Sequence, residues 1–115
     1  MASNEELPVH LEEIPDGVVM CPQGDIDLSK APALRARIAE VFEGGHSRVI
    51  VDLGEVQYMD SSGVATLVEG MQIATRSGTK FILTGLQERV RSIFEIARLD
   101  MVFTITSDRE TAERA

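Results

Sequence analysis

The segment Asp60-Ser61-Ser62-Gly63 places one carboxylate and two hydroxyls on consecutive residues, between a strand-like run and a helix-like run. A serine hydroxyl at the start of a helix can accept a phosphoryl group, because unpaired amides and a partial positive charge stabilise the resulting anion. Gly63 would allow another molecule to approach the backbone closely. The alternative is purely structural: one serine caps the helix and Gly63 eases a tight turn.

Signatures of catalysis and of metal binding are absent from the sequence. It contains no Gly-x-Ser-x-Gly motif, no glycine-rich phosphate-binding loop and no His-Glu-x-x-His. His10 and His46 lack neighbours at metal-ligand spacing, and neither is positioned to act as a base for a serine. Cys21 is the only cysteine, which excludes an internal disulfide or thiolate cluster, and we expect it in the core. We therefore expect no enzyme, no catalytic residues, no metal site and no cofactor.

The composition is that of a globular protein with an acidic surface. Of the 115 residues 43% are hydrophobic, and 19 acidic against 11 basic side chains give a formal charge of -8. This charge argues against nucleic-acid binding and favours partners with basic surfaces. The apolar runs are too short to span a bilayer, and the acidic N-terminal sequence does not resemble a secretory signal. We expect a cytoplasmic protein without membrane insertion, as a monomer or weak dimer.

Alternating hydrophobicity and turn residues predict five strands. Segments 7–14 and 18–24 are joined by Pro15-Asp16-Gly17, where proline fixes φ and glycine supplies a positive φ, so an N-terminal hairpin is expected. The run at 48–53 is rich in β-branched residues, which indicates a strand covered on both faces. Further strands are predicted at 80–85 and 102–106.

Four helices are predicted to alternate with these strands. The first follows Ser29, a candidate N-cap, and ends at Gly44-Gly45. The second begins at Ser62, and the fourth follows Ser107, which has a glutamate three residues later as in a capping box. Helical spacing predicts buried faces of Leu34, Ile38, Val41 and Phe42 in the first helix, Val64, Leu67, Val68 and Met71 in the second, and Leu86, Val90, Ile93, Phe94 and Ala97 in the third, over 86–99.

The order of these elements, β-β-α-β-α-β-α-β-α, predicts the fold class. Buried strands that alternate with helices of crossover length indicate an α/β fold in which a mixed sheet of about five strands carries about four helices. The sequence shows no repeat, low-complexity tract or linker, so a single domain over residues 1–115, with a core at 7–112, is expected.

Three segments in this order resemble the STAS family, the anti-sigma-factor antagonists and their relatives. They are GDIDLSKAPALR (24–35), VIVDLGEVQYMDSSGVATLV (49–68) and KFILTGLQERVRSIFEIARLDMVFTI (80–105). The first matches the family's Gly-acid-apolar-Asp stretch before a helix, and the second its strand, Asp-Ser-Ser/Thr-Gly motif and helix. The resemblance covers roughly residues 7–112 and implies a STAS-like fold.

The resemblance also implies a regulatory switch. The hydroxyl after the motif aspartate is the phosphoacceptor, which corresponds to Ser61, with Ser62 as second choice. Asp27, Asp60, Ser62 and Gly63 correspond to motif and partner-interface positions. In this scheme the unphosphorylated antagonist binds an anti-sigma factor that is a GHKL-type serine kinase, which frees the sigma factor for transcription. Phosphorylation breaks that complex, and a PP2C-type phosphatase restores it.

A second function stays open at this point. STAS-type accessory subunits of ABC-type membrane transport complexes share the fold, can keep a hydroxyl at the acceptor position and dock to the ATPase of the complex. Retention of both Ser61 and Ser62, together with the acidic composition, favours the phosphorylation switch.

Overall fold

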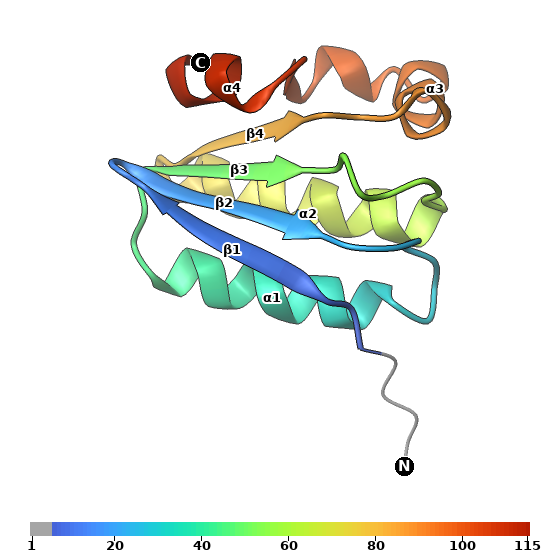
Figure 1. Cartoon of the computed structure of the whole chain (residues 1–115), viewed down its shortest axis with the longest axis horizontal. Helices are drawn as coiled ribbons and strands as arrows, with labels where there is room; N and C mark the ends of the chain where they lie inside the picture. The colour runs from blue at the N-terminus through green and yellow to red at the C-terminus, as the bar shows by residue number, and fades with distance from the viewer. Residues whose placement is uncertain (1–5) are drawn as a thin grey trace.

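Five strands and four α-helices form one layered α/β unit in the computed structural model, which describes residues 6–115 (Figure 1). The strands are β1 (Val9–Ile14), β2 (Gly17–Pro22), β3 (Arg48–Asp52), β4 (Lys80–Thr84) and β5 (Thr104–Thr106). The helices are α1 (Ala31–Glu43), α2 (Ser61–Ser77), α3 (Glu88–Ile96) and α4 (Arg109–Arg114), with a short 3-10 helix η1 (Leu99–Met101) before β5. The predicted fold class is confirmed.

The strands pair in the order β1-β2-β3-β4-β5, with β1 antiparallel to β2 and all other pairs parallel. The predicted turn at Pro15-Asp16-Gly17 produces the β1–β2 hairpin, in which Ile14 lies opposite Gly17. Because β2, β3 and β4 are parallel, their carboxyl ends lie at one edge of the sheet. The loops that follow β2 and β3 therefore emerge side by side at this edge.

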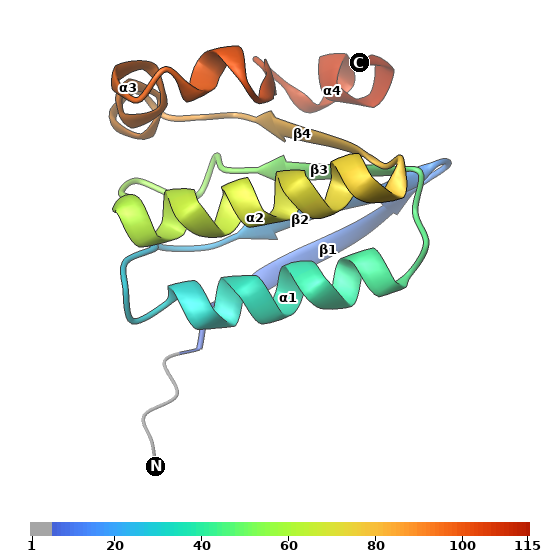
Figure 2. The same cartoon turned by 180° about the vertical axis from the view of Figure 1, so that it is seen from behind.

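Helices α1 and α2 lie together across one face of the sheet (Figure 2). Residues at alternate strand positions point into this layer, and the larger core includes Val18, Met20, Val49, Val51, Phe81 and Leu83. The intervening residues Val19, Ile50 and Ile82 pack with Ala112 of α4 on the other face. Burial on both faces explains why the central strands are continuous apolar runs.

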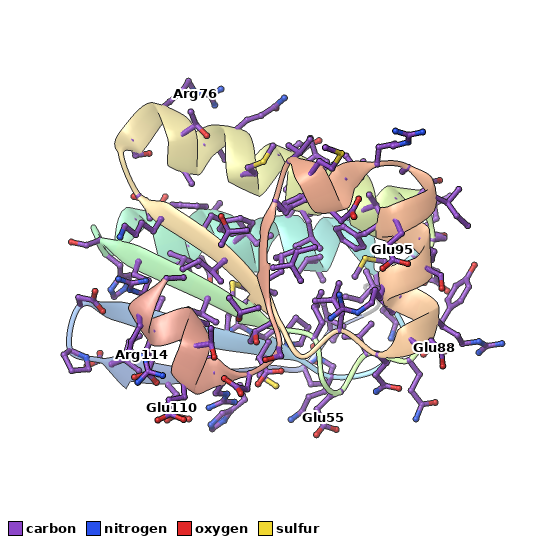
Figure 3. All side chains as sticks on the ribbon, turned by 90° about the horizontal axis from the view of Figure 1, so that it is seen from above. Glu55, Arg76, Glu88, Glu95, Glu110 and Arg114 are labelled. Atoms are coloured by element: carbon purple, nitrogen blue, oxygen red, sulfur yellow. The ribbon has the colours of Figure 1, made fainter. Side chains whose placement is uncertain are left out.

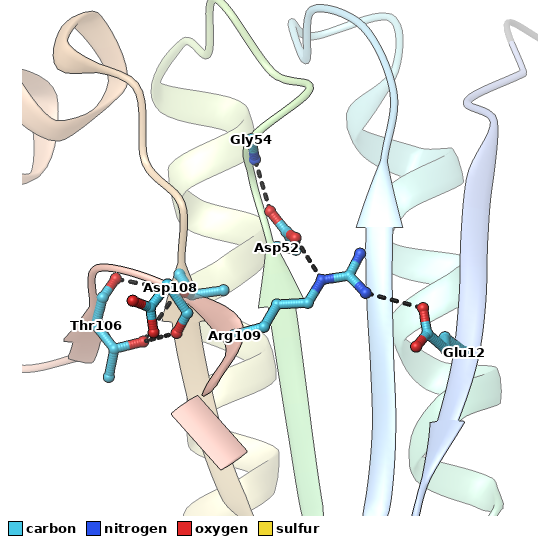
Figure 4. A network of polar contacts seen from close by, with 7 residues as sticks. Glu12, Asp52, Gly54, Thr106, Asp108 and Arg109 are labelled. Atoms are coloured by element: carbon cyan, nitrogen blue, oxygen red, sulfur yellow. Dashed lines mark hydrogen bonds and ion pairs between the residues drawn. The ribbon is translucent and has the colours of Figure 1, made fainter. Parts of the chain in front are cut away.

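A chain of polar contacts attaches α4 to the sheet (Figure 4). Arg109 Nε lies 2.7 Å from Asp52 Oδ2, and Arg109 Nη1 lies 2.8 Å from Glu12 Oε1. Asp52 also accepts a hydrogen bond of 2.9 Å from the backbone N–H of Gly54, after β3. Arg48, itself buried, donates to the carbonyl oxygen of Ala112 at 3.0 Å. These contacts compensate for the small apolar area of a six-residue helix.

Two predicted N-caps are wrong. Lys30, not Ser29, is the N-cap of α1 and has no side-chain cap bond; the Ser29 hydroxyl instead donates to Asp27 Oδ1 at 2.6 Å. Asp108, not Ser107, caps α4, because its carboxylate accepts from the N–H of Thr111 at 2.8 Å. In both places the stronger acceptor, a carboxylate, holds the local backbone.

The third helix is shorter than predicted. It ends at Ile96, and Arg98 adopts a left-handed conformation with φ of 62° before η1 begins. Ala97, predicted on the buried face, is therefore exposed, whereas Val90 and Phe94 are fully buried as expected. Strand β5 is also shorter than predicted, because Val102 and Phe103 precede it in an irregular segment.

Candidate functional site

Residues 60–63 lie where the chain passes from β3 into α2, beside the loop that follows β2. We call residues 23–30 the β2–α1 loop and residues 53–60 the β3–α2 loop. Three backbone hydrogen bonds join them: Gly24 N to Glu55 O at 3.1 Å, Ile26 N to Tyr58 O at 2.9 Å, and Asp60 N to Ile26 O at 3.1 Å. Ile26 and Met59 also form a parallel β-bridge. The two loops thus extend the sheet beyond β2 and β3 and bring Asp27 and Asp60 to the same edge.

Asp60 connects the two loops to α2. Its Oδ1 accepts hydrogen bonds from the backbone N–H of Ser62 at 2.9 Å and of Gly63 at 3.3 Å, so Asp60 is the N-cap of the helix. Its Oδ2 accepts from the backbone N–H of Leu28 in the β2–α1 loop at 3.1 Å. One carboxylate therefore satisfies the helix end and fixes the neighbouring loop.

The two serines lie in different environments. Ser61 is the first residue of α2 and is exposed, and within residues 6–115 no hydrogen bond engages its hydroxyl. Ser62 is half-buried, and its hydroxyl donates to Asp60 Oδ1 at 2.5 Å. The expectation that a serine hydroxyl caps this helix is wrong, since Asp60 is the cap, and α2 begins at Ser61 rather than Ser62. Ser61 is left accessible at a helix N-terminus.

Hydrogen bonds keep both motif carboxylates charged. The pKa of Asp60 lies below its ordinary value, chiefly because the Ser62 hydroxyl donates to it, with backbone N–H groups of Gly63, Ser62 and Leu28 adding to the effect. The pKa of Asp27 is lowered mainly by the Ser29 hydroxyl, while the negative charge of Asp60 opposes the shift. The charge of Asp60 therefore reaches Asp27, and Asp60 itself directly precedes the accessible Ser61.

Gly63 is buried where α2 touches the paired loops. A Cβ atom at this position would lie 2.6 Å from Met59 Cγ and 2.9 Å from Ile26 Cγ2. The close approach that Gly63 permits is therefore made by the chain's own residues. Ile26 and Met59 are both fully buried, so the glycine allows α2 to sit directly on the bridge between the loops.

Gly63→Ala is expected to lower the free energy of unfolding by about 1–3 kcal/mol, the usual range for overpacking a core. Gly70→Ala in the same helix is a matched control. A Cβ there would lie 3.1 Å from its nearest neighbour, Phe81 Cζ, which is less crowded than the site of Gly63. Alanine also gains up to ~1 kcal/mol of helix propensity, so a smaller loss of stability is expected. Urea unfolding of both variants measures the difference. An equal loss in the two would contradict the packing role assigned to Gly63.

The other residues singled out from the sequence lie elsewhere. Cys21 is buried as predicted, and burial raises the pKa of its thiol. His10 is exposed and His46 half-buried. In the part of the chain from residue 6 onward, no three His, Cys, Asp or Glu side chains are grouped to hold a metal ion. None of the helices described there is long and apolar enough to cross a membrane.

Sequence reasoning missed Leu28 at this site, where its side chain is 74% exposed. The position of Tyr58-Met59 before the motif predicts that both pack at the strand-to-helix loop; Met59 is fully buried, but Tyr58 is 44% exposed. Leu28 directly follows the motif residue Asp27 and precedes the apolar stripe of α1, which was the one available signal. Its contact with Asp60 spans 32 positions of sequence and could not be read from local pattern.

Comparison with known proteins identifies the family. The family model described as the STAS domain matches residues 9–112. The chain is 30% identical to BtrV of Bordetella bronchiseptica, named as a candidate anti-sigma factor antagonist, over 95% of this chain and 94% of that protein. It is 31% identical to the anti-sigma-B factor antagonist of Bacillus subtilis, over 76% of this chain and 79% of that protein.

The fold has a counterpart among solved structures. The phosphorylated form of the Bacillus cell fate determinant SpoIIAA matches with a TM-score of 0.71 at 24% identity, covering 93% of this chain and 98% of that one. The residues that match the family model run from β1 into α4 and include the Asp60–Gly63 segment. The chain belongs to the STAS domain family.

Proposed function

We propose that this chain is an anti-sigma-factor antagonist that is switched by phosphorylation of Ser61. The observation that carries the proposal is that Asp60 and the two serines have different hydrogen-bonding roles at the start of α2. Asp60 caps the helix and holds the Ser62 hydroxyl, which leaves the Ser61 hydroxyl exposed. The relatives named as anti-sigma factor antagonists support the regulatory role, and the phosphorylated form of SpoIIAA supports a covalent switch in this fold.

The partner in this proposal is an anti-sigma factor that is also a serine kinase of the GHKL type. Unphosphorylated, the antagonist binds the kinase and frees the sigma factor for transcription. The kinase transfers the γ-phosphoryl group of ATP to Ser61 Oγ, the serine proton is lost and ADP is released. A PP2C-type phosphatase hydrolyses the ester and restores binding. The chain is thus a substrate and binding partner, and we expect the cycle to run in the cytoplasm.

The charge change at Ser61 accounts for the loss of binding. Phosphorylation adds about -1.5 to -2 charges beside Asp60 and Asp27, whose carboxylates are already ionised. The amide groups of a helix N-terminus tolerate an added anion, so the fold itself is expected to remain intact. The unfavourable energy appears at the interface, where a partner surface that suited a neutral hydroxyl must desolvate a dianion.

Mass spectrometry after incubation with the cognate kinase and ATP tests the assignment. We expect one phosphate on Ser61 in the wild-type chain and in Ser62→Ala, whose acceptor hydroxyl is intact. A phosphate on Ser62 would reverse the roles of the two serines. Modification at neither residue, by a kinase shown to bind the chain, would contradict the proposed function.

A further inference from the structure

Leu28 is an exposed apolar side chain on a firmly held loop. Its relative exposure is 74%, and among the large apolar residues from residue 6 onward only Ile96 at 84% and Met101 at 79% are more exposed. A single exposed leucine is unremarkable in itself, since folded surfaces carry many apolar atoms. What distinguishes Leu28 is how its backbone is positioned and which residues surround it.

The backbone of Leu28 is fixed relative to the phosphoacceptor. Its N–H donates to Asp60 Oδ2 at 3.1 Å, so it is bonded to the residue that immediately precedes Ser61. Leu28 also lies within a tight turn that begins at Asp27. The N–H groups of Lys30 and Ala31 both donate to the Asp27 carbonyl oxygen at 3.0 Å. A side chain held in this way loses little additional backbone freedom when a partner covers it, which favours binding.

Tyr58 offers a second large side chain on the paired loop. It is 44% exposed, and its carbonyl oxygen accepts from the N–H of Ile26 at 2.9 Å, one of the bonds that join the two loops. Leucine and tyrosine are thus presented from adjacent loops that are hydrogen-bonded to each other, and the loop that carries Tyr58 leads into Ser61. A few residues that enter well-packed pockets carry most of the energy of a protein interface, and either an aromatic or an aliphatic side chain can be such an anchor.

The charge of the two loops defines the surface that would cover them. Residues 23–30 and 53–60 contain four carboxylates, Asp25, Asp27, Glu55 and Asp60, and a single cationic residue, Lys30. Glu55 is exposed and projects outward from the molecule (Figure 3). An apolar anchor within an acidic surround is complementary to an apolar pocket bordered by lysine and arginine.

We propose that Leu28 is the apolar anchor by which the anti-sigma-factor kinase recognises this chain. It enters a pocket on the kinase surface whose rim carries basic side chains that face Asp25, Asp27 and Glu55. The inference rests on the proposed function and adds the residue that gives affinity for the partner. Asp60 has a positioning role in this scheme, because it fixes Leu28 with one oxygen and the start of α2 with the other.

Leu28→Ser tests the anchor, and Val102→Ser is its matched control. Val102 is 54% exposed and borders a surface pocket lined by Ala74 and Thr75. At a rise of 1.5 Å per residue, that end of α2 lies about 20 Å from Ser61. Figure 3 likewise shows Arg76, in the last turn of α2, on the opposite side of the molecule from Glu55. Both variants exchange an exposed apolar side chain for serine.

Titration calorimetry with the kinase and steady-state phosphorylation measure the effect. We expect Leu28→Ser to weaken binding of the unphosphorylated chain roughly tenfold or more and to raise KM for phosphorylation, with little change in kcat at saturation. Val102→Ser should stay within about twofold of wild type. Leu28→Met, which keeps an apolar side chain of similar volume, should bind nearly as wild type does.

The outcomes separate the inference from the function on which it rests. Wild-type affinity in Leu28→Ser, with Ser61 still phosphorylated, would overturn the anchor and leave the proposed function standing. An equal loss in Leu28→Ser and Leu28→Met would also overturn it, because apolar character would then not be what the kinase recognises. Absence of Ser61 phosphorylation in the wild-type chain would contradict the proposed function itself.

Discussion

Ser61→Ala is expected to bind the kinase whether or not ATP is present, whereas Ser61→Asp and the phosphorylated wild type bind it at least 100-fold more weakly. Alanine cannot accept a phosphoryl group and leaves the partner a small neutral surface. Desolvating an unpaired anion costs several kcal/mol, and each ~1.4 kcal/mol weakens binding tenfold. A change confined to one side chain is therefore sufficient to switch the complex.

The carboxylates around Ser61 do not by themselves account for this loss of binding. Asp60 precedes it, and the Asp27 carboxylate is close enough for the charge of Asp60 to influence its pKa. A basic pocket rim on the partner, which pairs with these carboxylates, would by itself attract the phosphate. The loss of binding therefore depends on the phosphate meeting groups that pack against the hydroxyl itself, which remain unable to solvate it.

Affinity measurements with the kinase, with and without ATP, check the prediction. Ser107→Asp is the matched control, because Ser107 is exposed and also stands at a helix N-terminus, that of α4. It adds the same charge away from the candidate site and should leave the affinity unchanged. Equal affinities of Ser61→Ala and Ser61→Asp would rule out interface repulsion as the mechanism.

Asp60→Ala is expected to lower the free energy of unfolding by about 2 kcal/mol, or roughly 10 °C in melting temperature, and to impair phosphorylation of Ser61. The substitution removes the cap of α2, the bond from the Ser62 hydroxyl and the bond to the β2–α1 loop together. Asp60→Asn keeps an oxygen that can cap the helix and is expected to lose less stability.

Asp108→Ala provides the control for helix capping alone. Asp108 caps α4 through Thr111, and the loss of that cap is expected to lower stability by about 1 kcal/mol. The additional loss in Asp60→Ala measures what the carboxylate contributes by joining the two loops. Thermal and urea unfolding give both values. If Asp60→Ala costs no more than Asp108→Ala, the loop-joining role is wrong.

The pH dependence of the Asp60 contribution follows from the direction of its pKa shift. The pKa is lower in the folded chain than the ordinary value of 3.8, so the charged carboxylate stabilises the fold at every pH above that value. Acidification through the lowered pKa removes the contribution. The stability difference between wild type and Asp60→Ala should therefore be constant from neutral pH to about pH 5 and shrink below about pH 4.

The sequence predicted the elements well because their signals are local. The hairpin at Pro15-Asp16-Gly17 and the buried central strands each depend on a few adjacent residues. The N-caps were harder, because serine and aspartate alternate as acceptors around Asp27, Asp60 and Asp108. Which of two neighbouring acceptors caps a helix depends on the backbone conformation of the residues just before the helix. That conformation is set by contacts with other loops.

Contacts between distant segments were beyond the reach of local pattern. The resemblance to the family assigned Asp27 and Asp60 to motif and partner-interface positions, but it did not imply that Asp60 bonds to Leu28. Arg109 was not expected to bridge Asp52 and Glu12, which are 57 and 97 positions away from it. Such pairs become visible only when the strand order and register fix which side chains share a face.

The coincidence of spatial and sequence order in the sheet has a kinetic consequence. Each strand pairs with the one before it, so no strand must insert between two that have already paired. After the hairpin, each new strand pairs with its predecessor across one crossover connection. This keeps the contact order low for a parallel sheet and favours rapid folding. A nascent chain can therefore add one unit at a time to a growing edge, beginning at its N-terminal hairpin.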